Sequence, residues 1–131
     1  YRPADDLAML FRLTVFNVAL GNTDDHLKNF SMLRDERGWR FAPAYDLTPN
    51  WTGSTEHQLS FGASCFPPDR ATVLGTAKAF GLSAKRAAVI IDDIVAAAKS
   101  WKRMFKRFEV PAFDVERLQA DIRQRLSRLQ S

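Results

Sequence analysis

Apolar residues recur at helical spacing in the first part of the chain. From Leu7 they return every three or four positions until the polar segment after Leu20, and this period is typical of a helix with one buried face. Asp5 or Asp6 can cap such a helix, and Gly21 can end it. We therefore predict a helix over residues 7–20. The positions expected on its buried face are Leu7, Leu10, Phe11, Thr14, Val15 and Val18.

The pattern changes twice before residue 69. Residues 30–42, FSMLRDERGWRFA, hold two short apolar-rich runs around the turn residues 35–38, which predicts a β-hairpin. Two strands alone are only marginally stable, so the hairpin must pack on another element. Residues 42–68 contain most of the prolines and no clear period. We predict irregular chain there, with a short extended piece at 58–61.

Helical periodicity then returns in three segments. The first is expected between a cap at Asp69 and Gly81, and the second begins at the Ser83 cap and continues for about 25 residues, or roughly 37 Å, before Pro111 ends it. The last is expected to start at an Asp114 cap, with Phe113 packing on Leu118. The second stripe is Ala87, Ile91, Ile94, Ala98, Trp101, Phe105 and Phe108, and the third is Val115, Leu118, Ile122, Leu126 and Leu129.

These elements predict a mainly α fold with one inserted β-hairpin. The 131 residues fit one domain, in which 69–131 form a helical subdomain. No apolar run reaches the roughly 18 residues of a membrane span, and the start does not resemble a signal peptide. The single cysteine, Cys65, excludes an internal disulfide and gives no zinc spacing. We expect it to be a buried or half-buried side chain of a cytoplasmic protein.

The candidate chemistry lies in the polar run after the first helix, GNTDDHLKNF at residues 21–30. Asp24 stands five positions before Asn29, and a second isolated acid, Asp46, follows the predicted hairpin. Phosphoryl transfer needs a carboxylate near the acceptor hydroxyl and oxygen ligands for magnesium beside the phosphates. The catalytic loop of protein kinases has the same interval from Asp to Asn. We predict that Asp24 faces the acceptor and that Asn29 and Asp46 face the metal.

The run GNTDDHLKNFS, the hairpin and YDLTP at 45–49 together closely resemble the C-terminal lobe of HipA-family serine/threonine kinases, the toxins of bacterial toxin–antitoxin pairs. The loop is more distantly similar to that of phosphatidylinositol kinases. The motif covers residues 21–49. This resemblance implies the helical lobe of a protein-kinase-like fold, with ATP and Mg²⁺ bound. It also implies a catalytic Asp24, magnesium at Asn29 and Asp46, phosphate contacts from His26 and Lys28, and Tyr45 beside the nucleotide.

Each of these residues also has a purely structural interpretation. The acids before His26 can form a helix-capping turn. His26 can be a hydrogen-bonded structural histidine, and Lys28 can be a charge partner of the acids. Tyr45 can serve packing alone. The role of Asp25 stays open, because many relatives carry glycine there. His57 has no partner at a recognisable spacing.

The run KSWKRMFKRF at 99–108 is the other feature with functional meaning. Its five basic residues fall opposite the apolar stripe, which favours the solvated face of a helix. The alternative is contact with DNA phosphates or with an acidic partner, because HipA-like kinases act in complexes with a HipB-like DNA-binding antitoxin. The basic residues are Lys99, Lys102, Arg103, Lys106 and Arg107.

The chain begins at Tyr1 and carries no glycine-rich phosphate loop. A kinase also needs such a loop and a lysine from a sheet-bearing lobe. We therefore expect a longer protein with an N-terminal lobe, and no activity from this piece alone. The leading hypothesis is the catalytic lobe of a HipA-like kinase that phosphorylates a protein substrate. The alternative is a non-catalytic helical module that binds an antitoxin or DNA.

Overall fold

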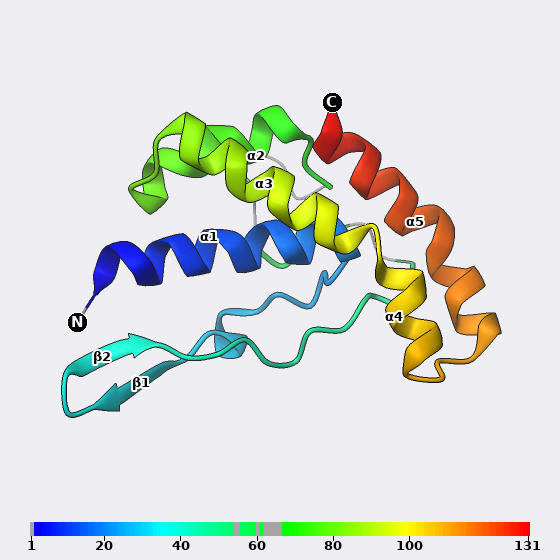
Figure 1. The fold of residues 1–131 in the computed structure, drawn as a ribbon, viewed down its shortest axis with the longest axis horizontal. Coiled ribbons are helices and arrows are strands. Elements are labelled where there is room, and N and C mark those ends of the chain that lie inside the picture. The colour runs from blue at the N-terminus through cyan, green and yellow to red at the C-terminus, as the bar shows by residue number, and fades with distance from the viewer. Residues whose placement is uncertain (1, 54–55, 60, 62–66) are drawn as a thin grey trace.

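The protein is described here by a computed structural model that places residues 2–53, 56–59, 61 and 67–131. Its fold is mainly helical, with one antiparallel hairpin in the described part, as predicted (Figure 1). Cys65 lies outside the described residues. The elements are α1 (Pro3–Leu20), η1 (Leu27–Asn29), β1 (Met32–Asp35), β2 (Gly38–Phe41), α2 (Arg70–Thr76), η2 (Ala77–Phe80), α3 (Ala84–Ala98), α4 (Trp101–Arg107) and α5 (Ala112–Gln130).

Helix α1 begins earlier than predicted and ends where expected. Pro3 occupies the first turn, where its missing N–H costs nothing, and neither Asp5 nor Asp6 caps the helix. Gly21 ends it in the left-handed conformation, with φ of 70°. Leu7 is exposed, Leu10 and Thr14 are half-buried, and the rest of the predicted face is buried. Those buried positions are Phe11, Val15 and Val18.

The hairpin forms at the predicted residues and packs against α1. The Phe41 N–H donates to the Asp6 carboxylate at 2.9 Å, so an acid predicted as a cap holds a strand instead. In the turn, the Asp35 carboxylate accepts from Arg37 N–H at 2.9 Å and from Arg40 Nε at 3.1 Å. These bonds, the first above all, lower the pKa of Asp35. The side chain of Asp35 thereby stabilises the tight turn.

The predicted long helix over 84–108 is wrong in one respect, because it breaks into α3 and α4. Ser100 Oγ donates to the Ala97 carbonyl at 2.8 Å, and such a local bond competes with the regular helix ladder. The stripe is buried as far as Trp101, whereas Phe105 is half-buried and Phe108 is 69% exposed. The caps at Asp69 and Ser83 are confirmed, since they accept from Thr72 N–H and Arg86 N–H.

Helix α5 also starts earlier than predicted. The Pro111 carbonyl accepts the first bond from Asp114 N–H at 3.0 Å, so Asp114 lies in the first turn and is not the cap. Its charge still suits the positive end of the helix dipole. Phe113 is 68% exposed and does not pack on Leu118 as a staple. The predicted core residues Leu118, Ile122, Leu126 and Leu129 are buried, and Val115 packs against them.

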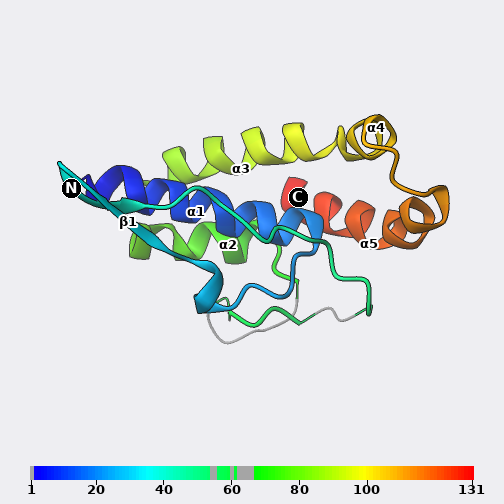
Figure 2. The ribbon, with the colours of Figure 1, turned by 90° about the horizontal axis from the view of Figure 1, so that it is seen from below.

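The core lies where α1 packs against α3 and α5. In Figure 1, α2 and α3 lie on one side of α1 and the hairpin lies on the other side; in Figure 2, seen from below, the chain after β2 passes across α1. The expected extended piece at 58–61 is a bend at Gln58 and Leu59 in its described part, and Phe61 forms an isolated bridge. The helices thus pack beneath a long stretch of chain without regular structure, at residues 42–53 and 56–59 of the described part. No helix in the described ranges has both the length and the apolar character to cross a membrane.

Candidate functional site

The polar loop that follows α1 is fixed by two distant segments of the chain. Its first residue, Gly21, accepts at its carbonyl from Asn50 N–H at 2.9 Å, and the Thr23 carbonyl accepts from Gln58 N–H at 3.2 Å. The Asn50 side chain donates to Thr23 Oγ1. The loop therefore has a defined backbone although it lacks regular structure before η1.

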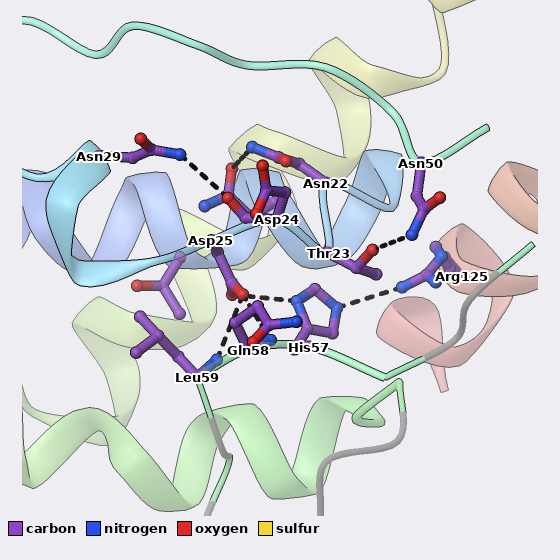
Figure 3. A network of polar contacts seen from close by, with 12 residues as sticks. Asn22, Thr23, Asp24, Asp25, Asn29, Asn50, His57, Gln58, Leu59 and Arg125 are labelled. Atoms are coloured by element: carbon purple, nitrogen blue, oxygen red, sulfur yellow. Dashed lines mark hydrogen bonds and ion pairs between the residues drawn. The ribbon is translucent and has the colours of Figure 1, made fainter. Parts of the chain in front are cut away.

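Asp24 is the exposed member of this loop. Its neighbours Thr23 and Asp25 are 2% and 3% exposed, whereas the Asp24 side chain is 64% exposed. Its carboxylate lies 2.8 Å from His26 Nε2. The Asn29 side chain donates through Nδ2 to the Asp24 backbone carbonyl at 3.0 Å (Figure 3). These contacts bring Asp24, His26 and Asn29 together, with the Asp24 carboxylate exposed at the surface.

The chain returning from β2 passes beside the same loop. Tyr45 OH donates to the Lys28 carbonyl at 3.0 Å and lies 2.6 Å from Ser31 Oγ. The next residue, Asp46, has a left-handed backbone with φ of 55°, a conformation in which Asp is less strained than most residues. Its carbonyl accepts a long bond of 3.5 Å from Asn22 Nδ2. Residues 45 and 46 are therefore attached to both ends of the loop.

The predicted metal ligands are near the loop but are not bonded to each other in the described structure. Asn29 and Asp46 make no mutual hydrogen bond, and no group of three His, Cys, Asp or Glu side chains among the described residues is arranged to hold a metal. Because Asn29 Nδ2 donates to Asp24, its Oδ1 lies on the other side of the amide. Asn29 is half-buried and Asp46 is exposed; their side-chain oxygens are of the type that Mg²⁺ takes, one or two carboxylates with water and phosphate oxygens, and their role toward a metal stays a prediction.

A cleft of about 420 Å³, lined by both polar and apolar groups, opens beside Asp24. It lies between the loop at Thr23 and Asp24 and the chain after residue 47. Its walls include Thr23, Asp24, Asn50, Trp51, Glu56 and Gln58. The carboxylate of Asp24 is thus accessible from a cavity large enough for a side chain of another molecule.

Two structural interpretations of the loop can now be decided. No side chain caps η1, because Thr23, Asp24 and Asp25 bond to Asn50, His26 and the 57–59 segment instead. The capping-turn interpretation is therefore wrong. Lys28 is exposed and forms no ion pair with any described residue, so it is not the charge partner of these acids.

Sequence reasoning missed a buried network behind the site. Asp25 Oδ2 lies 3.0 Å from His57 Nδ1, and Arg125 Nη1 lies 3.2 Å from His57 Nε2. Arg125 Nε also donates to Asp121 Oδ2 at 2.7 Å. His57 and Arg125 are 3% and 1% exposed. The only signals in the sequence were an unexplained second acid and an isolated histidine, because the partners are far apart along the chain.

Comparison with known proteins relates this chain to a protein family and to a named bacterial protein. A family described as "HipA-like C-terminal domain" matches residues 1–102. A protein of Sinorhizobium fredii (strain NBRC 101917 / NGR234) named "Putative kinase Y4mE" is 50% identical over 46 residues. That match covers 35% of this chain and 11% of the Sinorhizobium protein. The chain therefore aligns with only a small part of that relative.

Proposed function

Because this chain belongs to the family of HipA-like C-terminal domains, we propose that it is the catalytic lobe of an ATP- and magnesium-dependent serine/threonine protein kinase. The observation that supports the proposal most is the exposed Asp24 carboxylate, held beside His26 and Asn29 at the mouth of a cleft. The name of the Sinorhizobium relative points to the same chemistry. We further propose that the complete protein is the toxin of a toxin–antitoxin pair in the cytoplasm.

In this proposal Asp24 orients the substrate hydroxyl and accepts its proton. The hydroxyl approaches through the cleft, where the carboxylate is accessible. The contact of His26 Nε2 with Asp24 at 2.8 Å helps to fix the carboxylate. His26 and the exposed Lys28 then present donors to the phosphates of ATP. Tyr45, which is 44% exposed while its OH is bonded to the Lys28 carbonyl, borders the nucleotide.

Asn29 and Asp46 would hold the magnesium ion through side-chain oxygens. When bound, the ion supplies positive charge that neutralises the β- and γ-phosphates during transfer. Asp46 contributes a negative charge from a left-handed backbone position, and residues in such sparsely populated conformations cluster at functional sites. Asn29 contributes a neutral oxygen from the same loop as Asp24.

The proposal assigns activity to the complete protein and not to this chain alone. A kinase holds the ATP phosphates with a flexible loop and a lysine from a second lobe. We therefore expect the isolated chain to be inactive. Magnesium-dependent phosphorylation by the isolated chain that Asp24→Ala abolishes would overturn this part of the proposal.

The decisive test is phosphoryl transfer by the full-length protein. Asp24→Asn should lower kcat by about 10³-fold, because it removes the proton acceptor. Circular dichroism and the unfolding temperature should stay unchanged, since the side chain is exposed. Asp93→Asn is the matched control, because Asp93 is a surface acid on α3 that pairs with Arg12 at 3.8 Å. Phosphorylation by Asp24→Asn at the wild-type rate would contradict the assignment.

A second function is favoured by the basic surface of α4 and of Lys99, which follows α3. All five of its basic residues are exposed, as predicted for a solvated face. A helical module that binds an acidic antitoxin surface or DNA phosphates would use this face. Titration with operator DNA at several salt concentrations separates the two functions, since phosphate contacts give a steep salt dependence. The residues are Lys99, Lys102, Arg103, Lys106 and Arg107.

A further inference from the structure

The buried side chain of Asp25 connects the loop to two other parts of the chain. Its Oδ1 accepts from Gln58 N–H at 2.8 Å and from Leu59 N–H at 3.2 Å. Its Oδ2 lies 3.0 Å from His57 Nδ1. A carboxylate that is 3% exposed is costly to bury unless donors surround it. Three donors from one distant segment satisfy this need, so Asp25 fixes the loop to residues 57–59.

The hydrogen bonds determine the proton on His57. Arginine can only donate, so Arg125 Nη1–H must donate to a lone pair on His57 Nε2 at 3.2 Å. The remaining ring nitrogen, Nδ1, then carries the proton and donates it to Asp25 Oδ2. His57 is therefore a neutral imidazole that accepts on one side and donates on the other. This order, Arg125 to His57 to Asp25, joins α5 to the loop (Figure 3).

The close fit of α5 against the end of α1 supports the same connection. A Cβ atom added at Gly21 would lie 2.7 Å from Asp121 Oδ2 and 2.8 Å from Arg125 Nε. The Asp121–Arg125 pair therefore sits directly against the glycine that opens the loop. Asp121 holds the Arg125 side chain at Nε, and Nη1 of the same guanidinium group contacts His57.

The direction of Asp24 follows from the burial of its neighbour. Residues 22–26 form non-helical chain, and inward and outward side chains alternate along residues 23–25. Thr23 and Asp25 are buried and Asp24 between them is exposed. Holding the Asp25 side chain inward therefore holds the Asp24 carboxylate outward, toward the cleft.

We propose that Asp25, His57 and Arg125 are positioning residues, which act through the loop backbone to aim the Asp24 carboxylate at the substrate hydroxyl. The inference rests on the proposed kinase function. It adds a requirement for α5, because Arg125 lies beyond residues 1–102 that match the family. It also gives a role to Asp25 and His57, whose partners were not evident in the sequence.

Two substitutions of His57 separate a positioning role from simple stability. Asn carries its amide nitrogen the same number of bonds from Cβ as His Nδ1, so His57→Asn keeps a donor toward Asp25. Gln places its amide near Nε2, so His57→Gln keeps an acceptor for Arg125 but loses the donor to Asp25. In the full-length protein, His57→Gln should lower kcat about 10- to 100-fold with little change in KM for ATP. His57→Asn should retain more of the activity.

Arg125→Gln tests the far end of the connection, with Arg70→Gln as its matched control. Arg70 Nη1 also bonds to α5, at the Leu129 carbonyl at 3.1 Å, but does not touch the loop. The two variants are compared at temperatures where each is equally far below its own unfolding temperature. Under these conditions Arg125→Gln should lower kcat by more than Arg70→Gln does. Equal kcat values at equal stability would overturn the inference, as would a His57→Gln enzyme as active as His57→Asn.

Nuclear magnetic resonance tests the positioning role without relying on kinase activity, so its outcome is independent of the proposed function. The ¹⁵N shifts of His57 should show a protonated Nδ1 and an unprotonated Nε2 at neutral pH. The backbone amide signals of Asp24 and His26 should move in His57→Gln and stay in place in Arg70→Gln. Absence of Asp24-dependent phosphorylation in the wild type would refute the proposed function alone. Unmoved Asp24 and His26 signals in His57→Gln would refute the positioning role, whatever the activity.

Discussion

Asp24 and Asp25 are adjacent acids with opposite surroundings. The Asp24 carboxylate is 64% exposed and contacts one imidazole, whereas Asp25 is 3% exposed and receives donors at both oxygens. A carboxylate at a cleft that still has free acceptor lone pairs can accept a proton from a substrate. A carboxylate saturated by buried donors can only hold the backbone in place. The comparison teaches that the loop places an accessible carboxylate and a buried, structural carboxylate at neighbouring positions.

The largest expected difference between the two acids is in stability. Asp25→Asn should lower the free energy of unfolding by about 3 kcal/mol, because it breaks a buried, hydrogen-bonded pair. If the NH₂ group of Asn faces His57, it meets the N–H donor at His57 Nδ1. Moving the ring proton to Nε2 would remove that clash but would point the proton at the donor Arg125. Asp24→Asn should change the same quantity by about 0.5 kcal/mol or less. Urea unfolding measures both, and equal values would refute the contrast.

Substitution of Gly21 tests how tightly α5 packs against the start of the loop. Gly21→Ala should destabilise the protein by about 2 kcal/mol or more, since it combines a positive φ with a clash against Asp121 and Arg125. Gly81→Ala is the matched control, because Gly81 also ends a helix at φ of 66° but has open space around its Cβ position. It should cost about 1 kcal/mol. Thermal unfolding that ranks Gly81→Ala as the more damaging change would argue against a tight contact of α5 with the loop.

The smallest expected effect concerns an exposed acid outside the site. Hydrogen bonds from Thr72, side chain first, lower the pKa of Asp69 at the start of α2. Since the unfolded chain keeps the ordinary, higher pKa, the ionised cap stabilises the fold above that value. This contribution is lost as the pH falls through the lowered folded pKa.

Asp69→Asn tests this pH dependence, because Asn also caps helices but carries no titrating carboxyl. The difference in unfolding free energy between wild type and Asp69→Asn should be constant above about pH 5 and change only at lower pH. Urea unfolding at a series of pH values measures it. A difference that varies between pH 6 and 8 would show that the cap is not its source.

The local elements were predictable from the sequence because local chemistry determines them. Gly21, Asp69 and Ser83 mark helix ends through conformational freedom or a short side-chain oxygen, and the structure confirms all three. The break at Ser100 was not predictable from periodicity, because the apolar stripe continues across it. There, one side-chain bond to a backbone carbonyl competes with the helix.

The site was predictable in part for the same reason. Asp24, His26 and Asn29 lie within one short loop, so the sequence alone places them close together, although their mutual contacts were not predicted. The support of Asp25 by His57 and Arg125 was missed, because those residues are 32 and 68 positions apart from their partners. Only tertiary packing brings them together. The roles of Asn29 and Asp46 toward a metal stay predictions.

The binding of Mg²⁺–ATP to the full-length protein, measured with Asp24→Asn and Asp46→Asn side by side, tests the central claim most directly. Asn suits the left-handed backbone at position 46 and removes only the charge. The account predicts that Asp46→Asn weakens magnesium-dependent ATP binding about tenfold or more, while Asp24→Asn binds ATP normally and transfers phosphate about 10³-fold more slowly than the wild type. Undiminished magnesium-dependent binding by Asp46→Asn, together with phosphate transfer by Asp24→Asn at the wild-type rate, would contradict it.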